Sequence, residues 1–193
     1  AETHSSMSLN PSPLRELRDQ PFELLLALEA RALTAEAPIG VTEVTDEWVG
    51  VAFRLGTETF LAAREETREV LAVPAHLTRV PGARPWVRGL HNVRGQLLPI
   101  IDLRQFLGSG VTAVHRKSRV LVVQHREVPV GLLVDEVLGF RRFPESTFEP
   151  VPPPTLVRCE HYLAGVFRRG GEAWPVFGLR RLVESPAFLA AAR

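Results

Sequence analysis

The residues that could support catalysis are few, and they form no recognisable reactive group. Cys159, Glu160 and His161 are consecutive in the chain, and a thiol, a carboxylate and an imidazole can act as nucleophile, base or metal ligand. A closed metal site needs further ligands at coordinating spacing, and the histidines provide no i, i+4 pair on a convincing helix. We therefore interpret Cys159 as a half-buried small residue, and keep an enzyme that uses Cys159 and His161 as an alternative.

Other patterns that carry chemistry are also incomplete. Two pairs of adjacent carboxylates, Asp135-Glu136 and Glu65-Glu66, would point to opposite faces of a strand, so the sequence predicts solvated surface charge there. The turn 92–95 has one glycine and leads into a strand, unlike a phosphate-binding loop. We predict no catalytic residue, no cofactor and no metal.

Composition narrows the class of protein. The chain has 193 residues, 45% hydrophobic and 23% charged, with a formal net charge of +1 and one cysteine. Nothing in this balance favours binding to nucleic acid or to an anionic membrane. No apolar run reaches the ~20 residues of a spanning helix, so membrane insertion is not expected. A lone cysteine fits a reducing compartment, and we expect a cytoplasmic protein.

The N-terminal region differs in texture from the rest. Residues 1–6 resemble an expression-tag remnant before Met7. Residues 7–45 are interpreted as an extension, in which apolar residues at helical spacing predict an amphipathic helix at about 21–35. Whether that helix packs on the main domain or binds a partner is left open, with packing as the default.

From Trp48 onward the pattern is that of short strands. The run 144–154 is rich in proline, which excludes helices there, and Pro99 implies an edge strand or a bulge. Ser185 and Pro186 can begin a last short helix. Many short strands with Gly- and Pro-rich turns favour a barrel or sandwich. Strands are predicted at 48–55, 59–62, 70–73, 86–90, 96–103, 119–124, 128–134, 137–143, 162–167 and 172–177, with short helical segments at 104–107 and 178–183.

The segment Gly89–Leu103, GLHNVRGQLLPIIDL, resembles the signature of the CheW family of chemotaxis coupling proteins. That signature is a Gly-x-x-Asn-x-Arg-Gly turn followed by an apolar strand that ends in Pro-x-x-Asp-Leu. Further segments match in the expected order, and together they cover about residues 47–184. These are Phe53–Phe60, Glu69-Val70, Val80–Gly82, Gly131–Val137 and Tyr162–Gly165.

The resemblance implies a mainly β fold: two SH3-like five-stranded β-barrels that share a hydrophobic seam. The CheW-like domain would span 46–185, with a short C-terminal helix at 186–193. It further implies a non-catalytic adaptor between a chemoreceptor tip and the regulatory domain of a CheA-like histidine kinase. The N-terminal extension resembles the PilI-like branch, which serves type IV pilus twitching motility. A regulatory domain detached from a kinase is the alternative.

By the same resemblance, Arg94 and Glu69 would lie close together on the partner-facing surface. We hypothesise an ion pair that positions Arg94, with a turn-locking salt bridge as the alternative. Asn92 and Asp102 are interpreted as structural, through turn and cap hydrogen bonds. Thr67 and His91 stand where the family often has other residues, and Thr67 puts the receptor contact at that point in doubt. Candidate protein-binding residues are Arg94, Glu69, Thr67, Val70, Val93 and Leu98, with Leu90 as a further groove residue.

Overall fold

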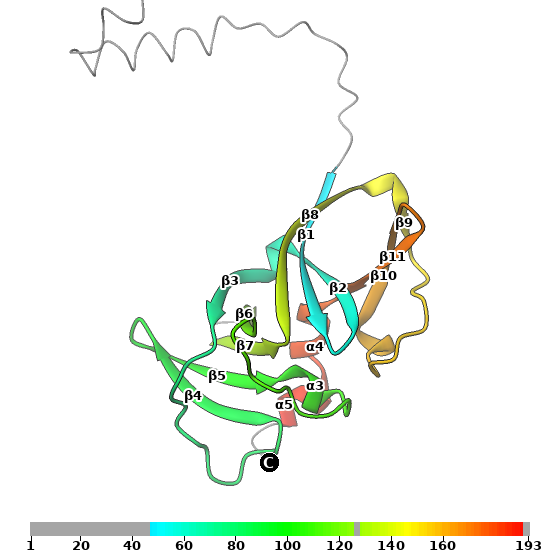
Figure 1. Ribbon diagram of the computed structural model, residues 1–193. Coiled ribbons are helices and arrows are strands. Elements are labelled where there is room, and N and C mark those ends of the chain that lie inside the picture. Colours follow the sequence, from blue (N-terminus) through cyan, green and yellow to red (C-terminus); the bar gives the residue numbers. More distant parts are fainter. Residues whose placement is uncertain (1–46, 126–127, 191–193) are drawn as a thin grey trace, which may run out of the picture. The chain divides into compact units, whose positions relative to one another are not determined.

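Two β-sheets make up most of the described chain, which is residues 47–125 and 128–190 of a computed structural model. The predictions for Met7, the extension and its helix lie outside these residues. The strands are β1 (Glu47–Leu55), β2 (Glu58–Ala63), β3 (Thr67–Ala72), β4 (Val87–Val93), β5 (Gln96–Asp102), β6 (Arg119–His125), β7 (Val128–Val134), β8 (Glu136–Pro144), β9 (Phe148–Glu149), β10 (Leu163–Arg169) and β11 (Glu172–Phe177). Figure 1 shows the sheet that contains β1 and β2 above the sheet that contains β4 and β5.

The predicted hairpins are the building units of both sheets. Antiparallel pairs β1–β2, β4–β5, β6–β7 and β10–β11 join neighbours in the chain. The six-stranded sheet has the order β8-β1-β2-β11-β10-β9, and the five-stranded sheet has the order β3-β6-β7-β5-β4. The predicted fold class, mainly β with two strand units and an apolar seam, is confirmed, although β9 gives one unit a sixth strand.

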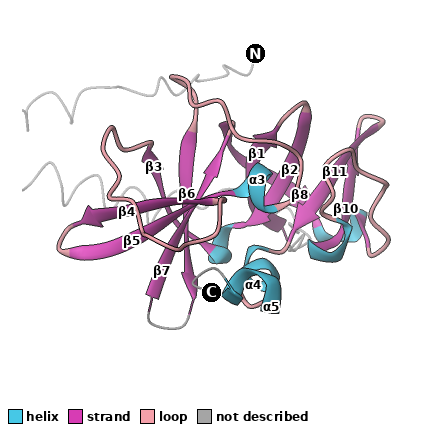
Figure 2. Ribbon diagram, turned by 90° about the horizontal axis from the view of Figure 1, so that it is seen from below, coloured by secondary structure: helices cyan, strands magenta, loops and turns pink. Residues whose placement is uncertain are grey.

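The helices are short, as expected, and lie beside the strands (Figure 2). Asp102 Oδ1 accepts a hydrogen bond from Gln105 N at the start of α3 (Leu103–Phe106), and Ser185 Oγ accepts one from Phe188 N at the start of α5 (Pro186–Leu189). Both predicted caps are therefore present. The helices are α3 (Leu103–Phe106), α4 (Leu179–Val183) and α5 (Pro186–Leu189), with 3₁₀ turns η1 (Arg64–Glu66), η2 (Glu145–Thr147) and η3 (Glu160–Tyr162).

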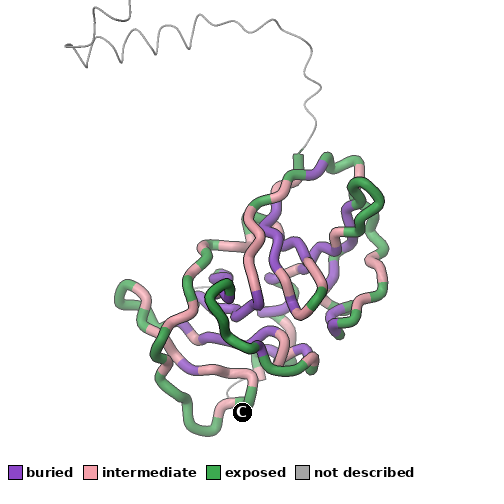
Figure 3. Tube along the Cα trace, viewed as in Figure 1, coloured by how far each residue is buried: buried purple, intermediate pink, exposed green. Residues whose placement is uncertain are grey.

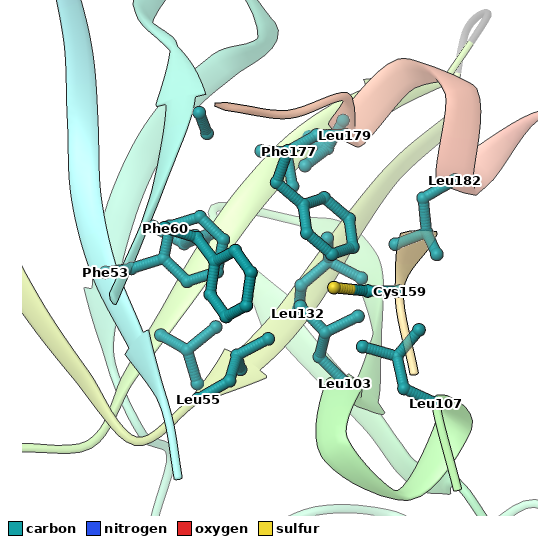
Figure 4. Packing of buried hydrophobic residues seen from close by; sticks show 14 of the residues in the cluster. Phe53, Leu55, Phe60, Leu103, Leu107, Leu132, Cys159, Phe177, Leu179 and Leu182 are labelled. Atoms are coloured by element: carbon teal, nitrogen blue, oxygen red, sulfur yellow. The ribbon is translucent and has the colours of Figure 1, made fainter. Parts of the chain in front are cut away.

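The apolar seam between the sheets is the main core. Its aromatic centre is Phe53, Phe60 and Phe177, whose ring centroids are 5.9–6.1 Å apart and which Figure 4 shows beside leucines from α3, α4 and β7. Each sheet also packs its other face on a smaller apolar cluster, one around Phe143 and Phe167 and one around Ile100 and Val122. Burial of both faces explains why strands such as β6 and β7 are almost continuously apolar.

Two glycines in the other segments that resemble the family are required by packing. A Cβ atom on Gly131 would lie 2.6 Å from Val120 Cγ1 and 2.7 Å from Ile100 Cδ1. A Cβ atom on Gly165 would collide with the ring of Phe148 and with the carbonyl oxygen of Glu149. Side-chain ends can move aside, whereas a paired strand backbone cannot do so easily, so the second site is the less tolerant one.

Two proline-based predictions need correction. Pro99 lies neither on an edge strand nor at a bulge: β5 is flanked by β4 and β7, and the irregular register in β4 falls between Val87 and Gly89. The proline is tolerated because the parallel ladder to β7 begins only at the next residue, Ile100. The proline-rich run also contains a 3₁₀ turn, Glu145–Thr147, where we expected no helix. Prolines lack a backbone N–H group, but a single 3₁₀ turn needs few backbone N–H donors and therefore fits between two prolines.

Three of the four adjacent carboxylates are not the solvated charges that we predicted, whereas Glu65 is exposed as predicted. Asp135 is buried and accepts a hydrogen bond from Gly56 N at 2.7 Å. Glu136 forms an ion pair with Arg54, also at 2.7 Å. Glu66 accepts from Leu179 N at 2.7 Å, at the start of α4. These acids join segments that are distant in sequence, which adjacency alone could not indicate.

Asp102 has a larger structural role than a helix cap. Its side chain is fully buried, and besides Gln105 N it accepts hydrogen bonds from Thr112 N at 3.0 Å and Thr112 Oγ1 at 2.8 Å. Arg88 contributes a longer ion pair of 3.5 Å. One carboxylate thereby fixes the end of β5, the start of α3 and the loop that follows α3.

We expect Gly131→Ala to lower the free energy of unfolding by about 1–3 kcal/mol, because the added methyl group overpacks the cluster around Ile100. Gly165→Ala should cost more, because its new methyl group meets backbone. Urea unfolding of both variants checks this order. Equal losses, or a larger loss for Gly131→Ala, would contradict the packing argument.

Asp102→Asn should destabilise the protein by about 1–3 kcal/mol, because an amide cannot accept from all the donors that surround the carboxylate. Chemical denaturation measures the effect. The matched control is Glu149→Gln, which removes the exposed pair with Arg168 and should change stability by less than about 1 kcal/mol. An Asp102→Asn protein as stable as the control would show that the buried network contributes little.

Candidate protein-binding site

The candidate site begins with an unusual hairpin turn between β4 and β5. Arg94 has a φ of 51° and Gly95 a φ of 84°, as in a type I′ turn with positive φ at both central residues. Asn92 Oδ1 accepts a hydrogen bond from Gly95 N at 2.9 Å, which agrees with its predicted structural role. Among the non-glycine residues that the structure describes, Arg94 alone has a positive φ.

The predicted ion pair is present. Arg94 Nη2 lies 3.4 Å from Glu69 Oε2 and joins the tip of the β4–β5 hairpin to the edge strand β3. The Arg94 side chain is 79% exposed and the Glu69 side chain 25%. Most of the guanidinium surface therefore stays available to another molecule.

The ion pair borders a groove of about 230 Å³, which we call the Arg94 groove. Its floor is apolar and belongs to the cluster that packs inside the five-stranded sheet. Its rim is polar and carries both charges of the pair. The lining residues are Arg68, Glu69, Val93, Arg94, Gln96, Leu98, Val122 and Pro129.

The candidate residues do not all share this groove. In register, Glu69 pairs with Val122, whereas Thr67 and Val70 pair with Val123 and Leu121, whose side chains point to the seam between the sheets. Thr67 and Val70 therefore lie on the opposite face of the sheet from Glu69. Leu90 also lies on the face opposite the groove, because it pairs with Pro99 rather than with Leu98.

Two adjacent leucines show what the sequence could not decide. Leu98 is 2% exposed and forms the floor of the groove, whereas Leu97 is 61% exposed beside the turn. Because strand side chains alternate, one of two neighbouring leucines must face out, but their identity gives no direction. Phe140 on β8, also 61% exposed, is a second apolar surface residue that sequence analysis did not single out.

Cys159 does not form a reactive centre with its neighbours. Its side chain is fully buried among the leucines of the seam (Figure 4), deeper than the half-buried position we expected, whereas Glu160 and His161 are exposed. Burial raises the pKa of the thiol to about 11, against a lowering hydrogen bond with Thr155. The thiol therefore stays protonated near neutral pH. Across residues 47–125 and 128–190, no three His, Cys, Asp or Glu side chains are grouped to hold a metal ion.

Comparison with known proteins identifies the family. Residues 49–187 match the CheW-like domain. The chain belongs to the CheW-like domain family.

Two relatives refine the relationship. Protein PilI of Pseudomonas aeruginosa is 40% identical over 170 residues, which are 88% of this chain and 94% of PilI. Protein FrzA of Myxococcus xanthus is 30% identical over 142 residues, 73% of this chain and 88% of FrzA. The predicted likeness to the PilI-like branch of the CheW family is thus confirmed.

The fold agrees as well. The crystal structure of the scaffolding protein TtCheW from Thermoanaerobacter tengcongensis matches with a TM-score of 0.64 at 26% identity, and covers 72% of this chain and 94% of that one. The comparisons support a CheW-like scaffold or coupling protein of a chemotaxis-like system. Over the described residues, every helix is too short or too polar to cross a bilayer.

We expect Cys159 to resist alkylation by iodoacetamide in the native protein and to react readily in denaturant, because only the exposed thiolate is nucleophilic. The folded thiol keeps its proton up to about pH 11, whereas the ordinary value is 9.0. Between pH 9.0 and about pH 11 the Cys159 thiol is largely deprotonated in the unfolded state but still protonated in the folded state. The free energy of unfolding therefore falls as the pH rises from 9.0 to about 11. Fast native alkylation at neutral pH would contradict both statements.

Proposed function

We propose that this CheW-like protein is a non-catalytic cytoplasmic adaptor. It couples the cytoplasmic tip of a methyl-accepting chemoreceptor to the regulatory domain of a CheA-like histidine kinase, and the pathway controls twitching motility by type IV pili. The family and the likeness to PilI and FrzA support this proposal. Arg94 and Glu69 are the proposed contact residues at the Arg94 groove, with Val93 and Leu98 on its floor. Thr67 and Val70 lie on the opposite face of β3 and remain proposed contact residues outside that groove.

The conformation of Arg94 is the observation that carries the proposal for this surface. An L-residue in the left-handed region costs roughly 1–2 kcal/mol, and type I′ turns favour Asn or Gly at the first central position. The exposed ion pair with Glu69 returns about 0–1 kcal/mol. Arginine is thus a poor choice for local stability here, and strained residues of this kind gather at functional sites.

The arrangement allows the Arg94 guanidinium group to bind a partner. Arg94 stands at a hairpin tip, and Glu69 holds it from the side while its outer N–H groups remain free for a carboxylate or a carbonyl of a partner. Below it lies the apolar floor of the groove, where Val93 is half-buried and Leu98 is buried. A charged rim around an apolar floor is the usual anatomy of a protein contact.

Arg94→Asn should raise the free energy of unfolding slightly, by up to about 1 kcal/mol, because it creates the preferred Asn-Gly turn. The same change should abolish recovery of the chemoreceptor fragment or of the kinase regulatory domain in pull-downs with purified partners. Thermal melting and pull-down on the same preparations test both halves.

Arg158→Ala is the matched control, because Arg158 is exposed and lies outside the Arg94 groove. It should leave both readouts unchanged. If folded Arg94→Asn protein recovers both partners as well as the wild type does, Arg94 is only a turn residue and this surface is not the contact. If the wild-type protein recovers neither partner, the adaptor function itself is wrong.

A further inference from the structure

A second concave surface lies at the other end of the apolar cluster that floors the Arg94 groove. It has a volume of about 720 Å³ and is walled by the β3–β4 connection on one side and by Val111 and Val114 on another. Along β5, Leu98 faces the Arg94 groove, whereas Ile100 faces this hollow. We call it the arginine hollow.

The charges on the arginine hollow are of one sign. Arg79, Arg84 and Arg88 line it, and none of its lining residues is acidic. Arg88 is engaged by Asp102 at 3.5 Å. The side chains of Arg79 and Arg84 are exposed, and within the described ranges neither forms an ion pair or a hydrogen bond. Two unpaired guanidinium groups therefore flank the opening.

The apolar wall is exposed to an unusual degree. Val80, Val111 and Val114 are among the large hydrophobic side chains that remain exposed in the protein, and all three line the hollow. Figure 3 shows that the connection between β3 and β4 is largely exposed along its length. Single exposed apolar residues scattered over a surface are normal in proteins, whereas exposed apolar residues grouped around a concavity indicate an interaction surface.

The hollow is held open by hydrogen bonds. The segment 73–86 is tied to β4 by Thr78 N to Leu90 O at 2.9 Å and Leu90 N to Thr78 O at 2.8 Å. Gly89 permits this approach, because a Cβ atom there would lie 2.6 Å from Thr78 O. On the opposite wall, the buried Asp102 holds Thr112, which stands between Val111 and Val114. The two walls are therefore fixed before any partner arrives.

We propose that the arginine hollow binds an acidic, apolar segment of a partner protein. The segment inserts aliphatic side chains between Val80 and Val111 and places carboxylates on Arg79 and Arg84. Charge complementarity selects this occupant, because the free charges at the opening are all cationic. Nucleic acid fits less well, since the described lining has no aromatic ring on which a base could stack.

The test uses the full chain and a short fluorescein-labelled peptide in which leucine and glutamate alternate. Fluorescence anisotropy should show binding that weakens with salt. Arg79→Glu/Arg84→Glu should weaken it at least about tenfold, which is about 1.4 kcal/mol. The same double variant should gain affinity for the matched leucine–lysine peptide, because the charges are now exchanged. Val80→Ser should lower the affinity of the wild-type protein for the leucine–glutamate peptide and of the double variant for the leucine–lysine peptide, because it removes part of the apolar wall.

The control is Arg64→Glu/Arg158→Glu, which changes net charge equally at exposed arginines outside the hollow. An equal loss in this control, or no binding by the wild type, rejects the proposal. Two other occupants are tested in parallel, by sedimentation and by binding to phosphatidylglycerol vesicles. If the peptide does not bind and Arg79→Glu/Arg84→Glu abolishes self-association, the hollow binds a second copy of the chain. If the peptide does not bind and the double variant abolishes vesicle binding, the hollow binds a membrane. No chemoreceptor or kinase is used, so the outcome is independent of the proposed adaptor function.

Discussion

Buried and half-buried carboxylates that accept backbone N–H groups are the interaction on which the rest of this structure depends. The sheets are built from short hairpins, so the long connections between them have no strand partner for their amides. Each such backbone N–H group needs a hydrogen-bond acceptor when it is buried. Glu58 supplies one to Leu156 N and Val157 N, and Asp102 supplies one to Thr112 N. The connections are thereby fastened to the sheets rather than left to solvent.

The same device marks the places where the chain passes from one sheet to the other. Asp135 separates β7 of the five-stranded sheet from β8 of the six-stranded sheet, and it binds Gly56 N and Arg104. Glu66 stands in the 3₁₀ turn between β2 and β3, the other crossing, and binds the start of α4. Because β3 begins directly after this turn, the anchoring of Glu66 also sets the position of Glu69 at the Arg94 groove.

What could be predicted from sequence follows from the range of each interaction. The hairpins and helix caps are local, and turn residues or Ser185 with Pro186 indicate them directly. The carboxylate contacts are not local: Glu58 meets Val157 across 99 positions, and Glu66 meets Leu179 across 113. For the candidate site, the family signature predicted the Arg94–Glu69 pair, whereas the facing of Leu97 and Leu98 depended on register that no single strand encodes. Likewise, Thr67 and Val70 were grouped with Glu69 although they lie on the other face.

Arg94 shows how a well-fastened scaffold permits a locally unfavourable residue. Native sequences usually agree with their structure at every level, and exceptions gather where function requires them. Arg94 lies outside the core cluster around Phe53, Phe60 and Phe177, so that cluster can supply stability while a strained residue stands at the hairpin tip. Selection for the fold alone would favour Asn or Gly at this position. The presence of an exposed, positive-φ arginine therefore argues that the tip is maintained for contact with another molecule rather than for the hairpin itself.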